Sequence, residues 1–330
     1  MGIDLGTANT LVYVSSKGIV LEEPSVVAIE RKTEYPRAFG KEAKLLLGRS
    51  PENIEALRPL KDGVIADFDA TEAMIHEFVK RAFEGNPLVH PRMVIGIPSG
   101  VTKLERRAVI EAATNAGARE VNLIEEPIAA AIGAGLPVTE ATGNMIIDIG
   151  GGTTEIAVIA LGGIVCDKSV KIAGDVFTND IIYYMRTQHN LFVGESTAEK
   201  IKIQIGAAVE DLETPPEDMS VQGRDLLTGK PKQVEVSHRE IAKALDKSIQ
   251  RIEDAIMETL SQTPPELAAD IYNTGIYLAG GGSMLRGLDK RISLKTDLPV
   301  YIAEDPLRAV VRGTGMALKN INRFKSILIK

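Results

Sequence analysis

Short apolar stretches alternate with amphipathic segments along the chain, and this alternation is typical of a protein that mixes strands with helices. Runs rich in Val, Ile and Leu, bounded by glycine and polar residues, predict two groups of strands. The predicted strands of the first group are 3–5, 10–14, 19–21, 25–29, 93–97 and 121–124. Those of the second group are 145–149, 154–160, 164–170 and 276–278.

Apolar residues that recur every three or four positions predict helices between these strands. The predicted helices are 71–83, 102–117, 125–135, 175–189, 197–209 and 237–260. Two of them begin with a capping box, in which a Ser or Thr side chain and a Glu three residues later each bind a free backbone N–H. These boxes are Thr102 with Glu105 and Ser237 with Glu240. The turn at 228–230 is expected to close a hairpin.

One stretch of the chain occurs twice. Residues 3–10 read IDLGTANT and residues 147–154 read IDIGGGTT, an offset of 144 (147 minus 3). The likeness continues from 10–14 to 154–158, and from 18–20 to 163–165 once a single residue is added in the second copy. The strand that runs into glycine at 276–282 also resembles 94–100. These repeats predict two related α/β domains, each with a mixed sheet.

Two irregular stretches interrupt this plan, one at about 31–66 and the other at about 190–236. Charge and proline in the first indicate a small inserted subdomain rather than a continuation of the sheet. We therefore expect an α/β fold of two duplicated domains, 1–144 and 145–330, each carrying one small insertion. The cleft between the domains is the expected binding site, and a C-terminal helix is expected to return to the first domain.

Each copy of the repeat is a strand that contains an aspartate and passes directly into glycine. Successive N–H groups in a glycine-rich turn form a concave anion site, and Asp4 or Asp148 adds an oxygen ligand suited to Mg²⁺. Either copy alone is more readily explained as a tight hairpin turn. The matched pair instead favours two turns that clamp one polyphosphate–metal group from both sides.

Three further sets of residues are candidates for the same site. Glu125 and Glu126 follow a strand and begin a helix, where a glutamate is either a common cap or a group that orients an attacking water. Glu199 and Lys202 are three residues apart on a helix, a spacing that ordinarily gives an ion pair. The turn at 280–283 precedes a helix and is a weak phosphate or ribose signal by itself.

The composition and motif content argue against several classes of protein, but they do not identify a function. The net charge of −7 argues against general binding to nucleic acid or to an anionic membrane, but it is compatible with a local contact to lipid. A single cysteine, Cys166, fits a reducing cytosol, and the start of the chain does not have the pattern of a signal peptide. No phosphate loop ending in Gly-Lys-Ser/Thr is present, and the four histidines have no metal-ligand spacing. We expect a cytoplasmic protein.

Several stretches resemble the motifs of the actin, sugar kinase and heat-shock chaperone superfamily, and more narrowly those of the MreB family of bacterial actin homologues. The stretches are 3–10, 148–154, 123–131 and 279–283, with further support from 22–26, 58–67 and 263–267. The resemblance covers essentially the whole chain. It implies an actin-like fold of two domains and four subdomains, with ATP and Mg²⁺ in the cleft.

The resemblance also implies a role for each candidate residue. Asp4 and Asp148 would lie near Mg²⁺, and Glu126, or else Glu125, would orient the attacking water. The phosphate-binding residues implied are Thr7, Ala8, Asn9, Gly150, Gly151, Gly152 and Thr153. The nucleoside-binding residues implied are Glu199, Lys202, Gly281, Gly282, Ser283 and Met284.

The activity implied by the family is ATP-dependent assembly into paired filaments at the inner face of the membrane, which guide cell-wall synthesis and rod shape. The implied partners are further copies of the chain, membrane lipid and cell-wall synthesis proteins. One departure is that the chain starts at Met1-Gly2, already in the first strand, without the apolar residues that such proteins often carry there. Leu88-Val89 is a candidate lipid contact. The alternative is a non-polymerising ATPase of this fold, either chaperone-like or a small-molecule kinase.

Overall fold

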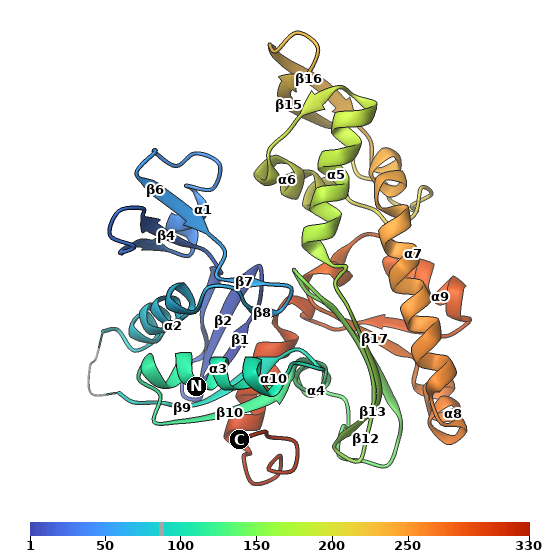
Figure 1. Ribbon diagram of the computed structural model, residues 1–330. Helices are drawn as coiled ribbons and strands as arrows, with labels where there is room; N and C mark the ends of the chain where they lie inside the picture. The colour runs from blue at the N-terminus through green and yellow to red at the C-terminus, as the bar shows by residue number, and fades with distance from the viewer. Residues whose placement is uncertain (86–88) are drawn as a thin grey trace.

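The computed structural model describes residues 1–85 and 89–330 and has two halves that lie side by side, each built on a five-stranded sheet (Figure 1). The first sheet has the order β10-β9-β1-β2-β3. Its strands are β1 (Gly2–Leu5), β2 (Asn9–Val14), β3 (Gly18–Pro24), β9 (Arg92–Ile97) and β10 (Glu120–Glu125). The second sheet has the order β13-β12-β11-β17-β18. Its strands are β11 (Asn144–Ile149), β12 (Thr154–Ala160), β13 (Gly163–Val170), β17 (Ile276–Ala279) and β18 (Val300–Ile302).

The two sheets have the same topology. Strand β1 is antiparallel to β2 and parallel to β9, and in the same way β11 is antiparallel to β12 and parallel to β17. The register of β2 against β3 shifts between Val12 and Tyr13, and that of β12 against β13 shifts between Val158 and Ile159. The predicted duplication is therefore confirmed at the level of strand order, direction and irregularity.

Helices surround the sheets, and the predicted capping boxes explain where two of them begin. The helices of the first half are α2 (Phe68–Ala82), α3 (Lys103–Asn115) and α4 (Glu126–Gly133). Those of the second half are α5 (Gly174–Gln188), α7 (His238–Gln262), α8 (Pro265–Thr274), α9 (Leu288–Thr296) and α10 (Ala309–Lys319), with the short 3-10 helices η1 (Gly281–Met284) and η2 (Pro306–Arg308). Both capping boxes are formed. Helix α2 begins at Phe68 rather than at 71 because the Asp67 side chain accepts a hydrogen bond from the Ala70 N–H.

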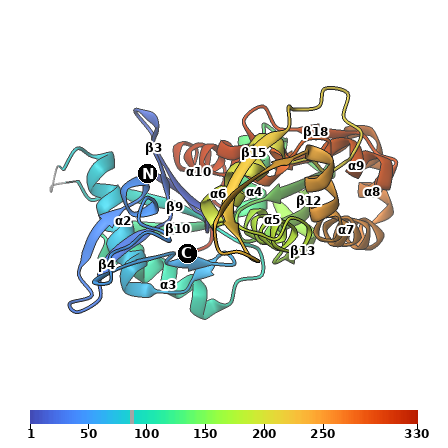
Figure 2. The ribbon, with the colours of Figure 1, turned by 90° about the horizontal axis from the view of Figure 1, so that it is seen from above.

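Each half carries a smaller three-stranded sheet. The first consists of β4 (Val27–Glu30), β5 (Pro36–Phe39) and β6 (Ile54–Leu57) with α1 (Lys41–Lys44), and β7 (Leu60–Lys61) pairs with β8 (Val64–Ile65) below it. The second consists of β14 (Leu191–Phe192), β15 (Met219–Asp225) and β16 (Pro231–Val236) with α6 (Glu195–Ile205). From above, β4 lies on the side of the first half and β15 over the second (Figure 2).

Helices α4 and α10 cross at the centre of the molecule and connect the two halves. Helix α4, from the first half of the sequence, packs on β11 and β12 of the second sheet, whereas α10 packs on β1, β2 and β9 of the first. The crossing is close because a Cβ atom at Gly133 would meet the Ala309 carbonyl oxygen at 1.8 Å, and one at Gly313 would meet the Ala129 carbonyl oxygen at the same distance. Only glycine fits at these two positions. Because the halves exchange helices, the domain bounds 1–144 and 145–330 stay predictions.

Three predicted elements differ from the structure. The strand expected at 25–29 is β4, which belongs to the small sheet and not to the main one. The helix expected at 197–209 ends at Ile205, because Gly206 leaves the helical conformation and Ala207 then pairs with Arg286. The turn after β17 leads into the 3-10 helix η1 before the next α-helix begins. Of the expected lipid contact Leu88-Val89, Leu88 lies outside the described residues.

Candidate functional site

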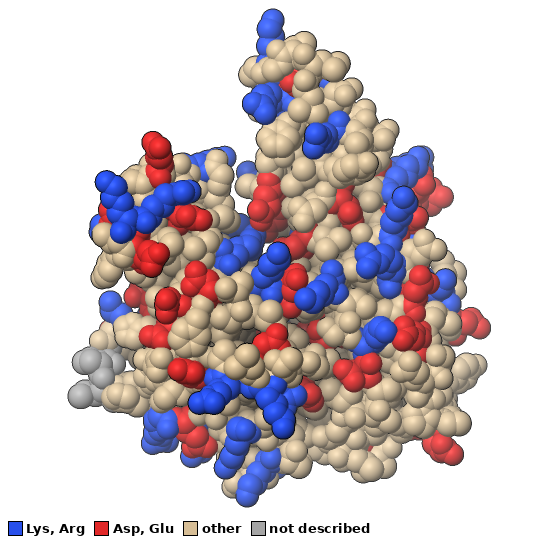
Figure 3. All heavy atoms as spheres, in the orientation of Figure 1, with Lys and Arg blue, Asp and Glu red and all other residues tan. Residues whose placement is uncertain are grey.

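A cavity of about 600 Å³ lies between the two halves, at the ends of the strands that form the repeat. It is lined by the turns after β1, β11 and β17 and by the first turn of α4. Helices α5 and α6 supply its upper wall. Figure 3 shows the gap that separates the upper parts of the two halves above this region. The cavity is large enough for a small ligand of the size that clefts of this kind usually bind.

The two repeated turns face each other across this cavity. A Cβ atom at Gly151 would lie 2.6 Å from the Cβ of Ala8, and one at Gly152 would lie 2.7 Å from the Thr7 hydroxyl oxygen. The hydroxyl oxygen of Thr7 also accepts a hydrogen bond of 2.9 Å from the Gly63 N–H. Glycine at 151 and 152 thus allows the two backbones to approach, as expected of turns that bind phosphate through their N–H groups.

Two aspartates occupy equivalent places on the two sheets. Asp4 in β1 and Asp148 in β11 both line the cavity. Burial raises the pKa of Asp4 to about 7. Burial, followed by the charges of Asp4 and Glu155, raises the pKa of Asp148 to about 8. Because no Lys or Arg among the described residues neutralises this pair, the arrangement fits a site that a bound cation completes.

The two adjacent glutamates at the start of α4 have different surroundings. Glu126 lines the cavity, and its pKa is raised well above its usual value by burial and then by the charges of Asp4, Asp148 and Glu155. Glu125 is the N-cap residue of α4, is half-buried, and does not line the cavity. Burial raises the pKa of Glu125, and the charge of Arg106 opposes that change. Of the two candidates, Glu126 is the one that faces Asp4 and Asp148.

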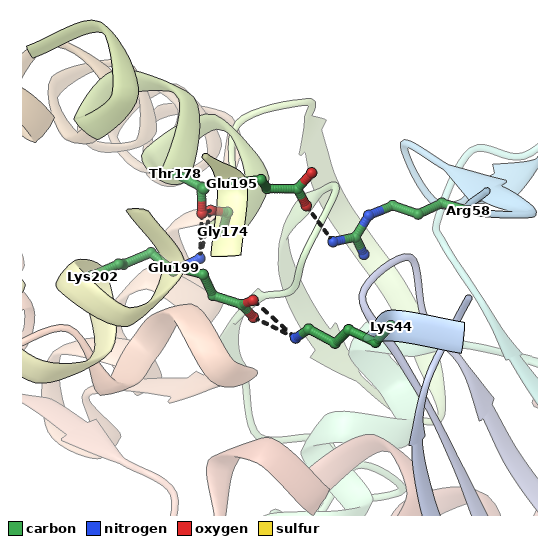
Figure 4. A network of polar contacts seen from close by, with 7 residues as sticks. All are labelled: Lys44, Arg58, Gly174, Thr178, Glu195, Glu199 and Lys202. Atoms are coloured by element: carbon green, nitrogen blue, oxygen red, sulfur yellow. Dashed lines mark hydrogen bonds and ion pairs between the residues drawn. The ribbon is translucent and has the colours of Figure 1, made fainter. Parts of the chain in front are cut away.

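The expected ion pair between Glu199 and Lys202 is wrong, although both residues line the cavity. Glu199 instead pairs with Lys44 of α1, at 2.9 Å. Lys202 donates hydrogen bonds to the Gly174 carbonyl oxygen at 2.7 Å and to the Thr178 hydroxyl at 2.9 Å, and burial lowers its pKa. Figure 4 shows these contacts together with a second ion pair, between Arg58 and Glu195.

Of the residues predicted in the third glycine-rich turn, all except Ser283 line the cavity. Gly280 has a φ of 77°, and a Cβ atom there would lie 2.4 Å from an Asp148 carboxylate oxygen. Gly281, Gly282 and Met284 line the cavity. The Ser283 side chain is buried and donates a hydrogen bond to the Gly280 carbonyl oxygen, so it holds the turn rather than facing the cavity. The remaining predicted phosphate residues, Asn9, Gly150 and Thr153, are part of the lining.

The prediction from sequence missed several lining residues. They include Arg58, Asp175, Glu195, Arg286 and Leu307. Arg58 lies in the irregular stretch 31–66 and Glu195 lies 137 residues later, so no local spacing connects them. The prediction also missed Glu155, which is buried beneath the second turn and accepts hydrogen bonds from Ser99 and Ser169. A charged residue in an otherwise apolar strand was the one available signal.

Comparison with known proteins places this cleft in a family. The family model described as MreB/Mbl protein matches residues 1–326. The chain belongs to the MreB/Mbl family. The cell shape-determining protein MreB of Escherichia coli strain K12 is 51% identical over 327 residues, which cover 98% of this chain and 94% of that protein. The cell shape-determining protein Mbl of Bacillus subtilis strain 168 is 46% identical over 324 residues, which cover 98% of this chain and 97% of that protein.

Solved structures show the same architecture. The crystal structure of MreB5 of Spiroplasma citri bound to ADP has a TM-score of 0.92 and 40% identity, and the match covers 98% of this chain and 97% of that one. A MamK double helical filament matches with a TM-score of 0.82 at 24% identity, over 97% and 98% of the two chains, and supports the fold alone. The fold of this MreB/Mbl chain is therefore actin-like. Among the described residues, no helix has both the length and the apolar character that crossing a membrane requires.

Proposed function

We propose that this chain binds ATP with Mg²⁺ in the cleft, hydrolyses it slowly, and assembles with further copies of itself into filaments. The observation that carries the proposal is the pair of facing glycine turns with Asp4, Asp148 and Glu126 between them. The structural relative MreB5 of Spiroplasma citri was solved with ADP and with AMPPNP, which supports a nucleotide in the same place. The curated relatives are cell shape-determining proteins, which supports a cytoskeletal role.

The phosphate chain would lie between the turns 7–9 and 150–153. Their backbone N–H groups and the hydroxyls of Thr7 and Thr153 supply donors for phosphate oxygens. Glu199 and Lys202 on α6, with Gly281, Gly282 and Met284, would line the nucleoside end of the site. Lys202 is held in place by hydrogen bonds to Gly174 and Thr178, so contacts within the chain position it on the wall of this end.

Asp4 and Asp148 are the residues that would hold Mg²⁺, which would neutralise charge on the phosphates. Nowhere in 1–85 or 89–330 do three His, Cys, Asp or Glu side chains form a metal site of their own. Phosphate oxygens and water would therefore complete the coordination, as is usual for this ion. Burial raises the pKa of both aspartates, and a bound cation would offset this effect by favouring the charged carboxylates.

Glu126 would orient the attacking water and accept its proton. Phosphoryl transfer depends mainly on positioning and charge neutralisation, so one carboxylate at the correct place is sufficient. In the structure its high pKa favours the protonated form. A cation beside it favours the ionised form that accepts a proton, which makes hydrolysis depend on the metal.

Assembly would take place at the inner face of the cell membrane, where the filaments guide cell-wall synthesis and rod shape. Membrane lipid and cell-wall synthesis proteins are the proposed partners, and nucleic acid is not, in keeping with a net charge of −7. The location is cytoplasmic and peripheral. These statements rest on membership of the MreB/Mbl family.

Sedimentation and electron microscopy over a concentration series test the proposal directly. With ATP and Mg²⁺ we expect pelleting and visible filaments above a critical concentration, and flotation with anionic liposomes. Chain that remains monomeric at every concentration, while it still hydrolyses ATP, would support the non-polymerising ATPase instead. Faster release of ADP on addition of a sugar would support a small-molecule kinase.

A further inference from the structure

Glu155 is a buried carboxylate that the proposed mechanism does not use. It is the second residue of β12, is 1% exposed, and stands directly opposite Asp148 across the β11–β12 pair. No Lys or Arg of the part of the chain that the structure describes forms an ion pair with it. Burying a carboxylate without a neighbouring cation costs free energy, so the hydrogen bonds that Glu155 accepts are needed to offset this cost.

The two oxygens of Glu155 are bound by serines from different halves of the molecule. Oε1 accepts a hydrogen bond of 2.7 Å from Ser169, its neighbour on β13 of the same sheet. Oε2 accepts a hydrogen bond of 2.6 Å from Ser99, which lies in the turn after β9 of the first half. One carboxylate thus links the second sheet to the first beneath the cavity.

The turn at Gly63 lies against Pro98, the residue before Ser99, and also against both phosphate turns. A Cβ atom at Gly63 would meet Pro98 at 2.6 Å and the Thr153 methyl carbon at 3.5 Å. The Gly63 N–H in turn donates to the Thr7 hydroxyl. Thr153 comes directly before β12, in which Glu155 is the second residue. The hydrogen bond from Ser99 to Glu155 therefore ties the turn that ends at Thr153 to the opposite half through a single side chain.

We propose that Glu155 is a positioning residue, which fixes the start of β12, and with it the turn that ends at Thr153, relative to the first half through its hydrogen bond to Ser99. This inference rests on the proposed ATPase function. Glu155 does not line the cavity, so it acts on the reaction only through the residues it holds. The hydrogen bond from Ser99 fixes the start of β12, which carries Thr153 at the edge of the cavity that Glu126 also lines. When the Ser99 contact is lost, the second turn keeps its glycine amides, but the start of β12 is no longer fixed relative to the half that carries Glu126.

The two serines provide a matched test, because each donates one hydroxyl to the same carboxylate at nearly the same distance. Ser99→Ala is expected to lower kcat for ATP hydrolysis about threefold to tenfold with KM changed less than twofold, the range that the net contribution of one typical hydrogen bond gives. Ser169→Ala should leave kcat within about twofold of the unmodified chain. Both variants should show similar, small decreases in Tm. Glu155→Gln, which keeps the shape of the side chain, should lower kcat at least as much as Ser99→Ala, and Ser99→Thr should restore it.

The outcomes separate this inference from the function on which it rests. Equal losses of kcat in Ser99→Ala and Ser169→Ala would show that Glu155 only stabilises its own sheet, and would overturn the proposal. Unchanged kcat in Ser99→Ala, with hydrolysis still reduced by Glu126→Ala, would also overturn it and leave the ATPase assignment intact. Hydrolysis that survives Glu126→Ala unchanged would instead contradict the proposed mechanism itself.

Discussion

The ammonium nitrogen of Lys44 lies 2.9 Å from Oε2 of Glu199, and this ion pair joins the first half of the chain to the second at the cavity (Figure 4). The pair between Arg58 and Glu195 makes a second connection from the same half to helix α6. Both pairs are partly exposed, so each contributes only about 0.2–1 kcal/mol. Together they bias the cleft toward a closed arrangement without locking it.

Lys44→Gln is therefore expected to speed the release of a fluorescent ATP analogue about twofold to fivefold, measured by stopped-flow chase with unlabelled ATP. The physical reason is that closure loses a contact of less than about 1 kcal/mol. Lys17→Gln is the control, since it removes a more exposed ion pair with Glu84 that lies within the first half. If Lys44→Gln and Lys17→Gln behave alike, the pair at the cleft does not control release.

Gly151→Ala should prevent the two phosphate turns from approaching each other. The added methyl would lie 2.6 Å from the Ala8 Cβ and 3.0 Å from its backbone nitrogen, neither of which can move freely. We expect ATP affinity to fall about tenfold or more, with Tm nearly unchanged because the strain is relieved when the halves separate. Gly150→Ala is the control, because its methyl would meet only the Thr153 carbonyl oxygen of the same turn, at 3.3 Å. Equal losses of affinity in the two variants would argue against a clamp made of facing turns.

Glu126→Ala should leave ATP binding intact and lower hydrolysis about tenfold or more, the smallest contribution usual for a positioned acid–base group. The measurement is phosphate release under saturating ATP, together with an equilibrium binding curve. Glu125→Ala is the natural comparison, because that carboxylate does not line the cavity. A larger loss in Glu125→Ala than in Glu126→Ala would reverse the assignment.

Asp148→Asn should weaken the binding of ATP in the presence of Mg²⁺, because one of the two carboxylates that would hold the cation is lost. In EDTA the same substitution should improve ATP binding slightly, since it removes negative charge next to the phosphates. Isothermal titration with and without Mg²⁺ compares the two. Affinity that is unaltered in both conditions would remove Asp148 from the metal site.

The nucleotide-free protein should also show an unusual dependence of stability on pH. The folded pKa of Asp148, about 8, is far above that of an aspartate in an unfolded chain, so the native state binds more protons between about pH 4 and pH 8. Its contribution to stability is therefore present at low pH and lost as pH rises through 8. Burial lowers the pKa of the Met1 ammonium to about 5, which gives the opposite slope. The quantity to measure is thus the gain in stability of Asp148→Asn over the unmodified chain, which should be larger at pH 8.5 than at pH 6.

The duplicated turns could be predicted because their signal is local. An aspartate at the end of an apolar strand, followed by glycine, constrains backbone shape within a few residues, and its repetition at 4 and 148 indicated a pair. The same repeat predicted that the two sheets are related, although it did not give their strand order. The capping boxes at Thr102 and Ser237 were predictable for the same reason, since they depend on residues three positions apart.

Contacts between distant segments could not be predicted in this way. Lys44 and Glu199 are 155 residues apart, and nothing near either residue identifies the other. The spacing predicts that Lys202 pairs with Glu199. In the structure Lys202 instead donates hydrogen bonds to a carbonyl oxygen and a hydroxyl oxygen of α5. The family resemblance places Ser283 at the nucleoside together with its neighbours in the turn. In the structure its hydroxyl donates a hydrogen bond to the Gly280 carbonyl oxygen and does not face the cavity. Side-chain direction in a short 3-10 helix depends on packing that the sequence does not display.

Helix α4 carries Glu126 near the middle of the chain, whereas the helix that crosses it is made from residues 309–319. During synthesis on a ribosome, the first half therefore emerges with the Ala129 and Gly133 face of α4 uncovered. The residues of both phosphate turns have already been made at that stage, but α4 gains its packing partner only after α10 has emerged. Because Val310 of α10 lines the cavity, translation order leaves this part of the cavity wall missing until residues 309–319 have been made.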